Sequence, residues 1–320
     1  MQIFAYENIS NEIRFNSSSG GIFTLLAERV LAKKGVVFGA AFDDNWNIKH
    51  IYTETISGLE QLRKSKYVYC NAAKCFKQVK TFLDNGRQVL FTGCPCQIAA
   101  LHNYLKRGYD NLLCAEVVCH GAPQASAWEM YLDDLLLKLG KTRKDICFID
   151  FRDKTNGWES YSFTMRFQDG SNFTEPAYSN YFMKLFLSDL IIKEGCFNCP
   201  FKQPNSKADI TFGDLWGMKH LLPEKYNTGG TSMVIVNTYK GERWLEHVNF
   251  ISKFTLGQVS RYNPAIVKRP VKPQAYDTFN AQLKNGKSIL LLSRKYYSVP
   301  LYRRAYHKIK AIACRIINGR

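Results

Sequence analysis

The sequence has 320 residues, of which 46% are hydrophobic and 14% aromatic, a composition typical of a globular protein rather than a disordered chain. It contains no run of about 18 apolar residues and no secretory signal pattern, so we expect a cytoplasmic protein without a transmembrane helix. In that compartment, ten cysteines favour metal or redox roles over structural disulfides. The net charge of +17 raises nucleic acid and anionic membranes as partners, but ten Lys and Arg and no Asp or Glu lie from residue 281 onward.

A serine- and glycine-rich turn precedes the first predicted helix, which covers residues 22–34. Its last three residues, Ser19, Gly20 and Gly21, either cap this helix or close their backbone on a phosphate, and the sequence leaves both readings open. Strands are predicted over 36–42 and 47–53, and helices over 57–63 and 73–83. Between these helices Lys66 lies in a basic turn, where it either pairs with a phosphate or is simply solvated.

Two successive predicted strands end in cysteine. The strand at 88–91 runs through Thr92 and Gly93 to Cys94 and Cys96, which open a helix extending to about residue 105, and the strand at 112–118 ends at Cys119. Because open α/β sheets bind ligands at the carboxyl ends of their strands, we expect these cysteines to line a site at one sheet edge. The next residue, His120, is either a ligand or an ordinary hydrogen-bonding side chain.

A further cysteine pair and two possible ligand contacts follow a predicted helix at 126–139. Arg152 and Trp158 flank a polar turn between predicted strands at 146–152 and 161–167, and they either contact a planar anionic ligand or form a salt bridge and aromatic packing. After a predicted helix at 181–192, Cys196 and Cys199 form a CxxC motif, which alone is ambiguous between zinc, an iron–sulfur cluster and a thiol redox pair. Together with Cys96 and Cys119 they supply the four thiolates typical of an iron–sulfur cluster.

The last third of the sequence ends in a basic amphipathic segment. Strands are predicted over 208–217 and 231–238, a helix over 241–251, and an irregular proline-containing segment over 264–273. Over residues 301–317, helical periodicity places Tyr, Ile and Ala on one half of the surface and Lys, Arg and His on the other. Such a helix either lies on an anionic membrane or docks on protein, so we expect a cytoplasmic protein with possible peripheral attachment.

The motifs from about residue 15 to about residue 275 together resemble the coenzyme F420 hydrogenase/dehydrogenase beta-subunit family. They are SSSGGIFT (17–24), KSKYV (64–68), FTGCPCQIAAL (91–101), VVCHGAPQ (117–124), FRDKTNGWESYSF (151–163), CFNCPF (196–201), ADITFGDLWG (208–217) and GGTSMVIVNT (229–238). The resemblance implies a mixed α/β, two-part flavin-binding fold divided into family domains at 10–100 and 105–275. The charge pattern adds a basic amphipathic tail at 281–320, beyond the matched residues.

The resemblance also implies the chemistry. It predicts an iron–sulfur flavoprotein oxidoreductase that passes electrons between FAD, a 4Fe-4S cluster and an unidentified substrate or carrier, as in members found in polysaccharide gene neighbourhoods. The predicted cluster ligands are Cys96, Cys119, Cys196 and Cys199. The predicted flavin contacts are Ser19, Gly20, Gly21, Lys66, Thr92 and Gly93, and the predicted substrate contacts are Arg152 and Trp158.

Three departures from the family pattern stand out. No ferredoxin-like module with CxxCxxC runs is found, so we expect a separate ferredoxin-like electron carrier or partner subunit. Cys94 replaces the usual Thr of the GTPCQ signature, and Cys70 stands where a small polar residue is usual. The alternatives are a basic, cysteine-containing nucleic-acid-binding protein and a thiol–disulfide enzyme using Cys196 and Cys199. We do not expect nucleic acid as a partner, because the charge is concentrated in the tail and no reading motif is recognised.

Overall fold

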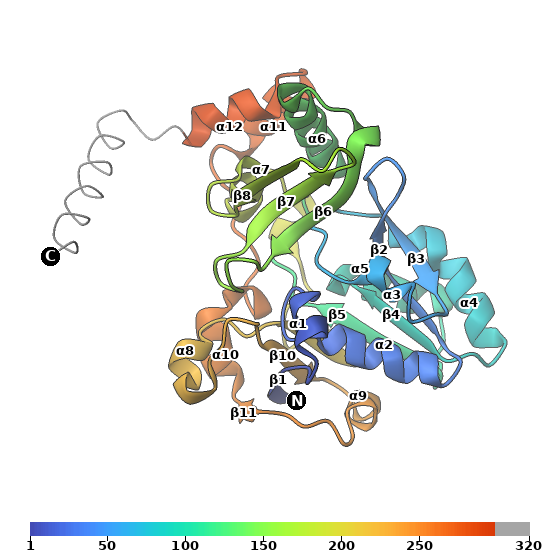
Figure 1. Ribbon diagram of the computed structural model, residues 1–320. Coiled ribbons are helices and arrows are strands. Elements are labelled where there is room, and N and C mark those ends of the chain that lie inside the picture. The colour runs from blue at the N-terminus through green and yellow to red at the C-terminus, as the bar shows by residue number, and fades with distance from the viewer. Residues whose placement is uncertain (298–320) are drawn as a thin grey trace, which may run out of the picture.

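Two β-sheets organise residues 1–297, which are the residues described by this computed structural model (Figure 1). The large sheet has eight strands in the order β11-β1-β10-β9-β5-β4-β2-β3, and the small sheet has three in the order β6-β7-β8. The large-sheet strands are β1 (Gln2–Tyr6), β2 (Val36–Phe42), β3 (Ile48–Thr53), β4 (Val89–Gly93), β5 (Leu112–Val117), β9 (Ile210–Asp214), β10 (Ser232–Val236) and β11 (Ser252–Phe254). The small-sheet strands are β6 (Ile146–Asp153), β7 (Ser162–Phe167) and β8 (Asn172–Pro176). The predicted mixed α/β class is confirmed.

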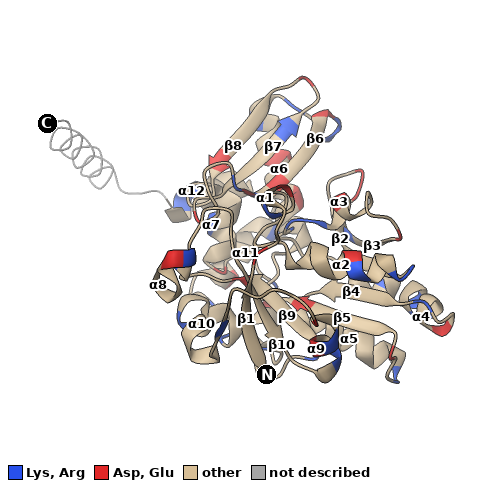
Figure 2. Ribbon diagram, turned by 60° about the horizontal axis from the view of Figure 1, so that its bottom comes forward, with Lys and Arg blue, Asp and Glu red and all other residues tan. Residues whose placement is uncertain are grey.

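Helices cover both faces of the parallel part of the large sheet, where β2, β4, β5 and β9 run side by side. Because successive side chains of a strand point to opposite faces, Val89 and Phe91 pack with α4 (Phe76–Asp84) and α5 (Pro95–Leu105), whereas Leu90 packs with α2 (Ile22–Ala32). Burial on both faces explains the continuous apolar runs of these strands. Outer helices such as α2 and α4 carry both acidic and basic residues (Figure 2).

The other end of the large sheet is antiparallel and includes the first strand of the chain. β1 pairs with β10 over five residues and with β11 over three, so it lies inside the sheet rather than at its edge. Three short helices lie in the loops near this end: α8 (Met218–Leu221), α9 (Tyr239–Trp244) and α10 (Leu256–Tyr262). The predicted helix over 241–251 is therefore wrong beyond Trp244, because the chain leaves the helix there to reach β11.

An aromatic core joins the small sheet to its helices. Trp128, Phe151 and Phe182 are buried together, and the Trp128 indole N–H donates to the Trp46 carbonyl at 2.8 Å. The helices are α6 (Ala125–Leu139), α7 (Tyr181–Leu187), α11 (Tyr276–Lys284) and α12 (Ile289–Tyr297). α7 is shorter than the predicted helix over 181–192, because Asp189 takes a left-handed backbone conformation with φ 65°.

The predicted domain boundaries stay predictions. The large sheet takes strands from both sides of residue 100. Residues 281–297 of the predicted tail belong to α11 and α12, whose Phe279, Ile289 and Leu292 are buried in the aromatic core. The amphipathic helix predicted over 301–317 lies outside the described residues. Among residues 1–297, no helix has both the length and the apolar character needed to cross a membrane.

The remaining helical turns are short. They are α1 (Asn11–Phe15), α3 (Leu59–Leu62), η1 (Ala72–Cys75), η2 (Arg143–Asp145), η3 (Glu194–Asn198), η4 (Pro223–Lys225) and η5 (Pro264–Ile266).

Candidate functional site

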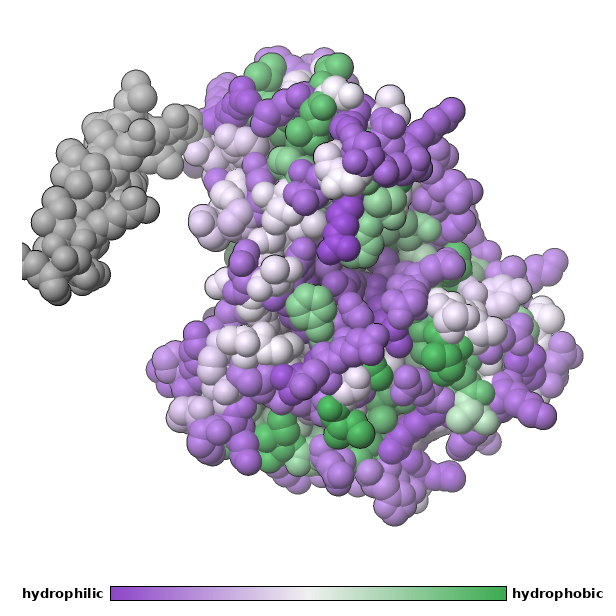
Figure 3. All heavy atoms as spheres, viewed as in Figure 1, coloured by the Kyte–Doolittle hydropathy of each residue, from purple (hydrophilic) through white to green (hydrophobic). Residues whose placement is uncertain are grey.

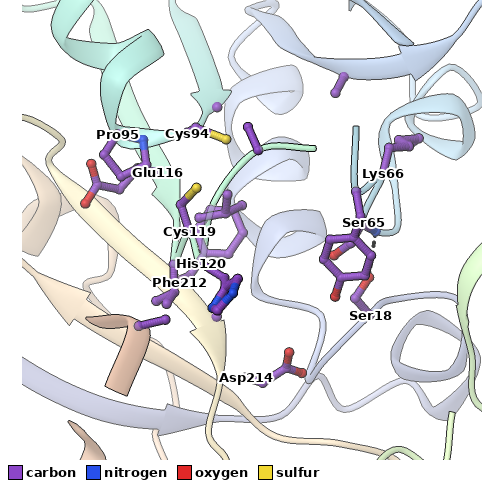
Figure 4. A pocket seen from close by; sticks show the side chains of 18 of the residues that line it. Ser18, Ser65, Lys66, Cys94, Pro95, Glu116, Cys119, His120, Phe212 and Asp214 are labelled. Atoms are coloured by element: carbon purple, nitrogen blue, oxygen red, sulfur yellow. Dashed lines mark hydrogen bonds between the residues drawn. The ribbon is translucent and has the colours of Figure 1, made fainter. Parts of the chain in front are cut away.

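A cavity of about 430 Å³ opens between the two sheets, where the surface is hollowed (Figure 3). Its walls come from the carboxyl ends of β4, β5 and β9, the loop before α2, the segment 62–70, and Arg152 and Tyr161 of the small-sheet half. Parallel strands present their carboxyl ends at one edge of a sheet, as the sequence predicts for the two cysteine-ended strands. The close-up in Figure 4 shows Cys94 and Cys119 from these neighbouring strand ends.

All four predicted cluster cysteines line this cavity. Cys96 lies in the first turn of α5 and Cys119 follows β5. The CxxC motif reaches them because the segment before it pairs with the segment after Cys119. The Lys193 N–H donates to the Ala122 carbonyl at 2.9 Å, and the Gln124 N–H donates to the Ile191 carbonyl at 2.8 Å. Cys196 then lies in η3, with Cys199 just after it.

The four thiols are close enough to influence one another's ionisation. Burial raises the pKa of Cys96 to about 11, and repulsion from Cys119, Cys196 and Cys199 adds to this effect. Cys94 is a fifth sulfur at the same place. A hydrogen bond from Cys94 lowers the pKa of Cys119, while the same bond and burial raise the pKa of Cys94.

Four cysteine thiolates are the donor set that a 4Fe-4S cluster uses. Among residues 1–297, no three His, Cys, Asp or Glu side chains converge closely enough to hold one metal ion. A 4Fe-4S cluster spaces its thiolate ligands about 7 Å apart, because the iron–sulfur core separates them. Four thiols around one cavity, contributed by β4–α5, β5 and η3, are compatible with that wider spacing.

The predicted flavin contacts line the same cavity as the cysteines, with one exception. Ser19, Gly21, Lys66, Thr92 and Gly93 line the cavity, but Gly20 does not. A Cβ atom at Gly20 would lie 2.3 Å from the Tyr6 carbonyl oxygen, so glycine is required there for close packing against β1. Gly21 begins α2 with φ 90°, and no side chain caps that helix end and no acid lies in its first turn. The free N–H groups of α2 therefore remain available to an anion.

Lys66 points its ammonium group toward carbonyl groups. Its Nζ donates to the carbonyl of Gln61 at 2.7 Å and to that of Arg63 at 2.6 Å, at the carboxyl end of α3. Burial lowers the pKa of Lys66 to about 7, and nearby Asp150 partly opposes this shift. In this structure, therefore, Lys66 ties together the turn that forms one wall of the cavity.

Of the two predicted substrate contacts, Arg152 lines the cavity and Trp158 does not. The Arg152 guanidinium pairs with both Asp214 carboxylate oxygens, at 2.8 and 3.0 Å, and its carbon atom lies 4.1 Å from the centre of the Tyr161 ring. Its Nε is buried and has no hydrogen-bond partner. Trp158 lies behind Trp216, which it stacks against at 4.7 Å, and donates to Asp214 at 2.6 Å.

A histidine–cysteine pair at the cavity wall was missed by sequence reasoning. His50 of β3 contacts the Thr92 carbonyl oxygen through Nε2 and the Cys70 sulfur through Nδ1, each at 3.0 Å. Because a carbonyl only accepts, Nε2 carries the proton and Nδ1 accepts from the thiol. Burial lowers the pKa of His50 and raises the pKa of Cys70 to about 11. The sequence offered one signal for His50: alternation along β3 places it on the face opposite exposed Lys49.

A buried acid was also missed. Glu116, at the carboxyl end of β5, lines the cavity with 2% of its surface exposed. One carboxylate oxygen accepts from the Thr211 hydroxyl at 2.8 Å, and the other has no partner. Burial raises the pKa of Glu116.

Comparison with known proteins adds the family. A family model for the C terminus of the coenzyme F420 hydrogenase/dehydrogenase beta subunit matches residues 86–261, and a model for the N-terminal part of the same beta subunit matches residues 5–77. The chain belongs to the coenzyme F420 hydrogenase/dehydrogenase beta-subunit family. The predicted family is therefore confirmed, and with it the assignment to a family of oxidoreductase subunits. No curated protein matches the sequence.

A solved structure has the same fold. It is a chain of the xenon-derivatised F420-reducing NiFe hydrogenase complex from Methanosarcina barkeri. The two share 16% sequence identity with a TM-score of 0.56, over 89% of this chain and 91% of that chain. At this identity the comparison supports the fold class of the family member described here.

The Arg152–Asp214 pair predicts a large stability difference between two carboxylate variants. Asp214→Asn leaves the buried Arg152 charge without its anion, so we expect a loss of about 3–5 kcal/mol of unfolding free energy. Asp133→Asn is the matched control, because Asp133 pairs with Arg143 but is 63% exposed, and we expect it to cost about 0–1 kcal/mol. Denaturant unfolding measures both, and equal losses for the two variants would contradict the assignment.

The buried His50 predicts a pH dependence of stability. Its folded pKa lies below the ordinary value of 6.5, so the unfolded chain binds the proton more readily and stability falls as pH drops below about 6.5. The slope is at most about 1.4 kcal/mol per pH unit for one group. His50→Asn removes this slope, whereas His247→Asn, which replaces an exposed histidine, keeps it. Parallel stability profiles of the wild type and His50→Asn between about pH 5.5 and 7.5, one unit either side of the ordinary histidine pKa, would show the prediction to be wrong.

Proposed function

We propose that this protein is an iron–sulfur flavoprotein oxidoreductase that passes electrons between FAD, a 4Fe-4S cluster and an unidentified substrate or carrier. The observation that carries the proposal is one cavity lined by four cysteines from three segments and by the open amino end of α2. Cysteine thiolates are the usual ligands of such clusters, and a helix amino end is a common site for a pyrophosphate.

Cys96, Cys119, Cys196 and Cys199 are the proposed cluster ligands. When bound, the cluster would carry single electrons and the flavin would accept or give electron pairs. Burial favours the neutral thiols of Cys96 and Cys196, and these lose their protons on binding iron, because the metal charge compensates the thiolates. Cys94 donates to Cys119 and so gives that sulfur an additional hydrogen bond.

Ser19, Gly21, Thr92 and Gly93 are the proposed flavin contacts that lie at the cavity surface. The uncapped amides of α2 would bind phosphate oxygens, and the glycines allow the backbone to approach the cofactor closely. Arg152 is the proposed substrate contact, through the Nε that has no protein partner. Tyr161 and Trp216 cover the guanidinium faces, with ring centres 4.1 and 5.1 Å from its carbon atom.

We also propose that the protein exchanges electrons with a partner subunit or with a separate ferredoxin-like carrier. The M. barkeri chain of similar fold comes from a hydrogenase complex. A thiol–disulfide enzyme using Cys196 and Cys199 is the rival candidate, but burial raises the pKa of Cys196, whereas an attacking thiol needs a lowered one. Membrane attachment through 301–317 stays a prediction.

Cofactor analysis of cysteine variants tests the cluster. Anaerobically purified wild type should contain FAD and about four iron and four sulfide per chain. Cys196→Ser should lose most of the iron and its broad visible absorption but keep FAD, because Cys196 lies on the cluster side of the cavity. Cys147→Ser is the matched control, since Cys147 is exposed on β6, and should keep both cofactors.

Each rival has its own outcome in this experiment. One zinc per chain, or a colourless protein that binds DNA, would favour the nucleic-acid-binding alternative. A colourless protein with a reversible Cys196–Cys199 disulfide would favour the thiol–disulfide enzyme. Equal iron content in Cys196→Ser and the wild type would remove Cys196 from the ligand set.

Lys66 tests the flavin phosphate site. If Nζ leaves the Gln61 and Arg63 carbonyls for a phosphate, Lys66→Met should weaken FAD binding by about tenfold or more, the worth of one charge-assisted hydrogen bond. The matched control is Lys49→Met, an exposed lysine of β3. Fluorescence titration of the apoprotein with FAD gives both constants. Unchanged affinity in Lys66→Met would leave Lys66 with only the structural role described above.

A further inference from the structure

A second groove opens on the surface beside the CxxC motif. It has a volume of about 420 Å³ and is lined by Cys199, Lys202, Val267, Lys268 and Arg269, among others. Cys199 lines both this groove and the deep cavity. It therefore connects the four cysteines with this groove on the surface.

The walls of the groove are fixed to one another. The Gln203 N–H donates to the Ile266 carbonyl at 3.0 Å, and the Lys202 ammonium donates to the Ala265 carbonyl at 2.8 Å. Lys202 also donates to the Cys119 carbonyl. Lys202 thus connects the backbone at Cys119 with the wall at Ala265, so the shape of the groove is already fixed before a partner binds.

The groove carries positive charge that the described residues do not neutralise. Lys268 and Arg269 are exposed, and neither forms an ion pair with any of residues 1–297. Two acids in the neighbouring segments, Glu194 and Asp277, both pair with Lys272. An anionic partner would therefore meet cations that are free to bind it.

An apolar side chain lies next to these cations. Val271 is 81% exposed, two residues after Arg269, and Val267 lines the groove itself. Apolar contacts beside unpaired charges are typical of surfaces that bind another protein for a short time, since the charges guide the encounter and the apolar area adds contact.

We propose that this groove docks an acidic one-electron carrier protein, which exchanges electrons with the protein through Cys199. In each encounter the reduced carrier loses one electron, the redox centre beyond Cys199 gains it, and no covalent bond forms or breaks. The proposal rests on the proposed function, because it needs a redox centre held by the cysteines. It adds the place of docking and the charge of the partner.

Electrostatic steering gives the proposal a measurable consequence. Complementary charge raises association rates by about 10- to 1,000-fold, and salt removes the effect. The double variant Lys268→Glu/Arg269→Glu reverses both groove charges. The matched control is Lys74→Glu/Lys77→Glu, which changes the net charge equally at exposed lysines of η1 and α4, on the opposite side of the fold from α10 (Figure 1).

The experiment mixes the anaerobic holoprotein with a chemically reduced, acidic plant-type ferredoxin in a stopped-flow spectrometer. At low salt the groove variant should accept electrons at least about tenfold more slowly than wild type, and the difference should disappear at high salt. The control variant should stay within about twofold of wild type. Deazariboflavin illuminated with a sacrificial amine donor yields an uncharged small reductant, which should reduce all three proteins equally.

The outcomes separate the two proposals. Equal ferredoxin rates for wild type and the groove variant, or an equal loss in the control variant, would overturn the docking site. A wild-type protein that neither ferredoxin nor deazariboflavin reduces would overturn the proposed function itself. If both reductants reduce the groove variant slowly, the substitution has damaged the redox site. Lost docking would then not explain the slow reaction with ferredoxin, and the proposal would be contradicted.

Discussion

The cavity depends on how β6 is tied to the large sheet by charge. Asp150 and Arg152 of β6, and Lys154 just after it, are alternate residues whose side chains contact the other half of the protein. Asp150 pairs with Lys64, Arg152 pairs with Asp214, and Lys154 donates to the Gly229 carbonyl at 2.7 Å. These three contacts form a polar seam between the two parts of the protein. The separation of the sheets, and so the width of the cavity, is set by these contacts.

Such a seam specifies geometry more than it adds stability. Taking two charges out of water costs about as much as their attraction returns, so the Arg152–Asp214 pair contributes little net free energy while it remains complete. Its two parallel hydrogen bonds nevertheless have one good orientation, which a purely apolar contact does not. Tyr161 and Trp216 add aromatic faces on either side of the guanidinium, and the result is a rigid wall for the site.

The sequence was informative where local pattern decides the structure. The sequence predicts Cys96 and Cys119 at one edge of the sheet, because each follows an apolar strand and a turn that a few residues are enough to reveal. The orientation of Trp158 was not predictable, since it depends on Trp216, which the chain brings near only in three dimensions. The orientation of Lys66 depends on the carbonyls of Gln61 and Arg63, which are close in the sequence but come within its reach only through the path of that turn. His50 was missed because nothing local distinguishes it from any half-buried strand residue. The approach of Cys196 to Cys119 depends on the pairing of 191–193 with 122–124. The sequence indicated it only through the number of cysteines that a cluster needs and through the family motifs, not through local pattern.

The position of β1 has a consequence for how the protein is made. Gln2 pairs with Val236, and Ile3 also pairs with Phe254, so β1 is synthesised long before either of the strands that it pairs with. At about 5–20 residues per second, the ribosome needs on the order of ten seconds or more to deliver β10. During that time an apolar five-residue strand waits unpaired while the parallel half of the sheet can already form. Translation order therefore sets a minimum time for sheet completion, and a chaperone that shields β1 during that interval would protect the nascent chain from aggregation.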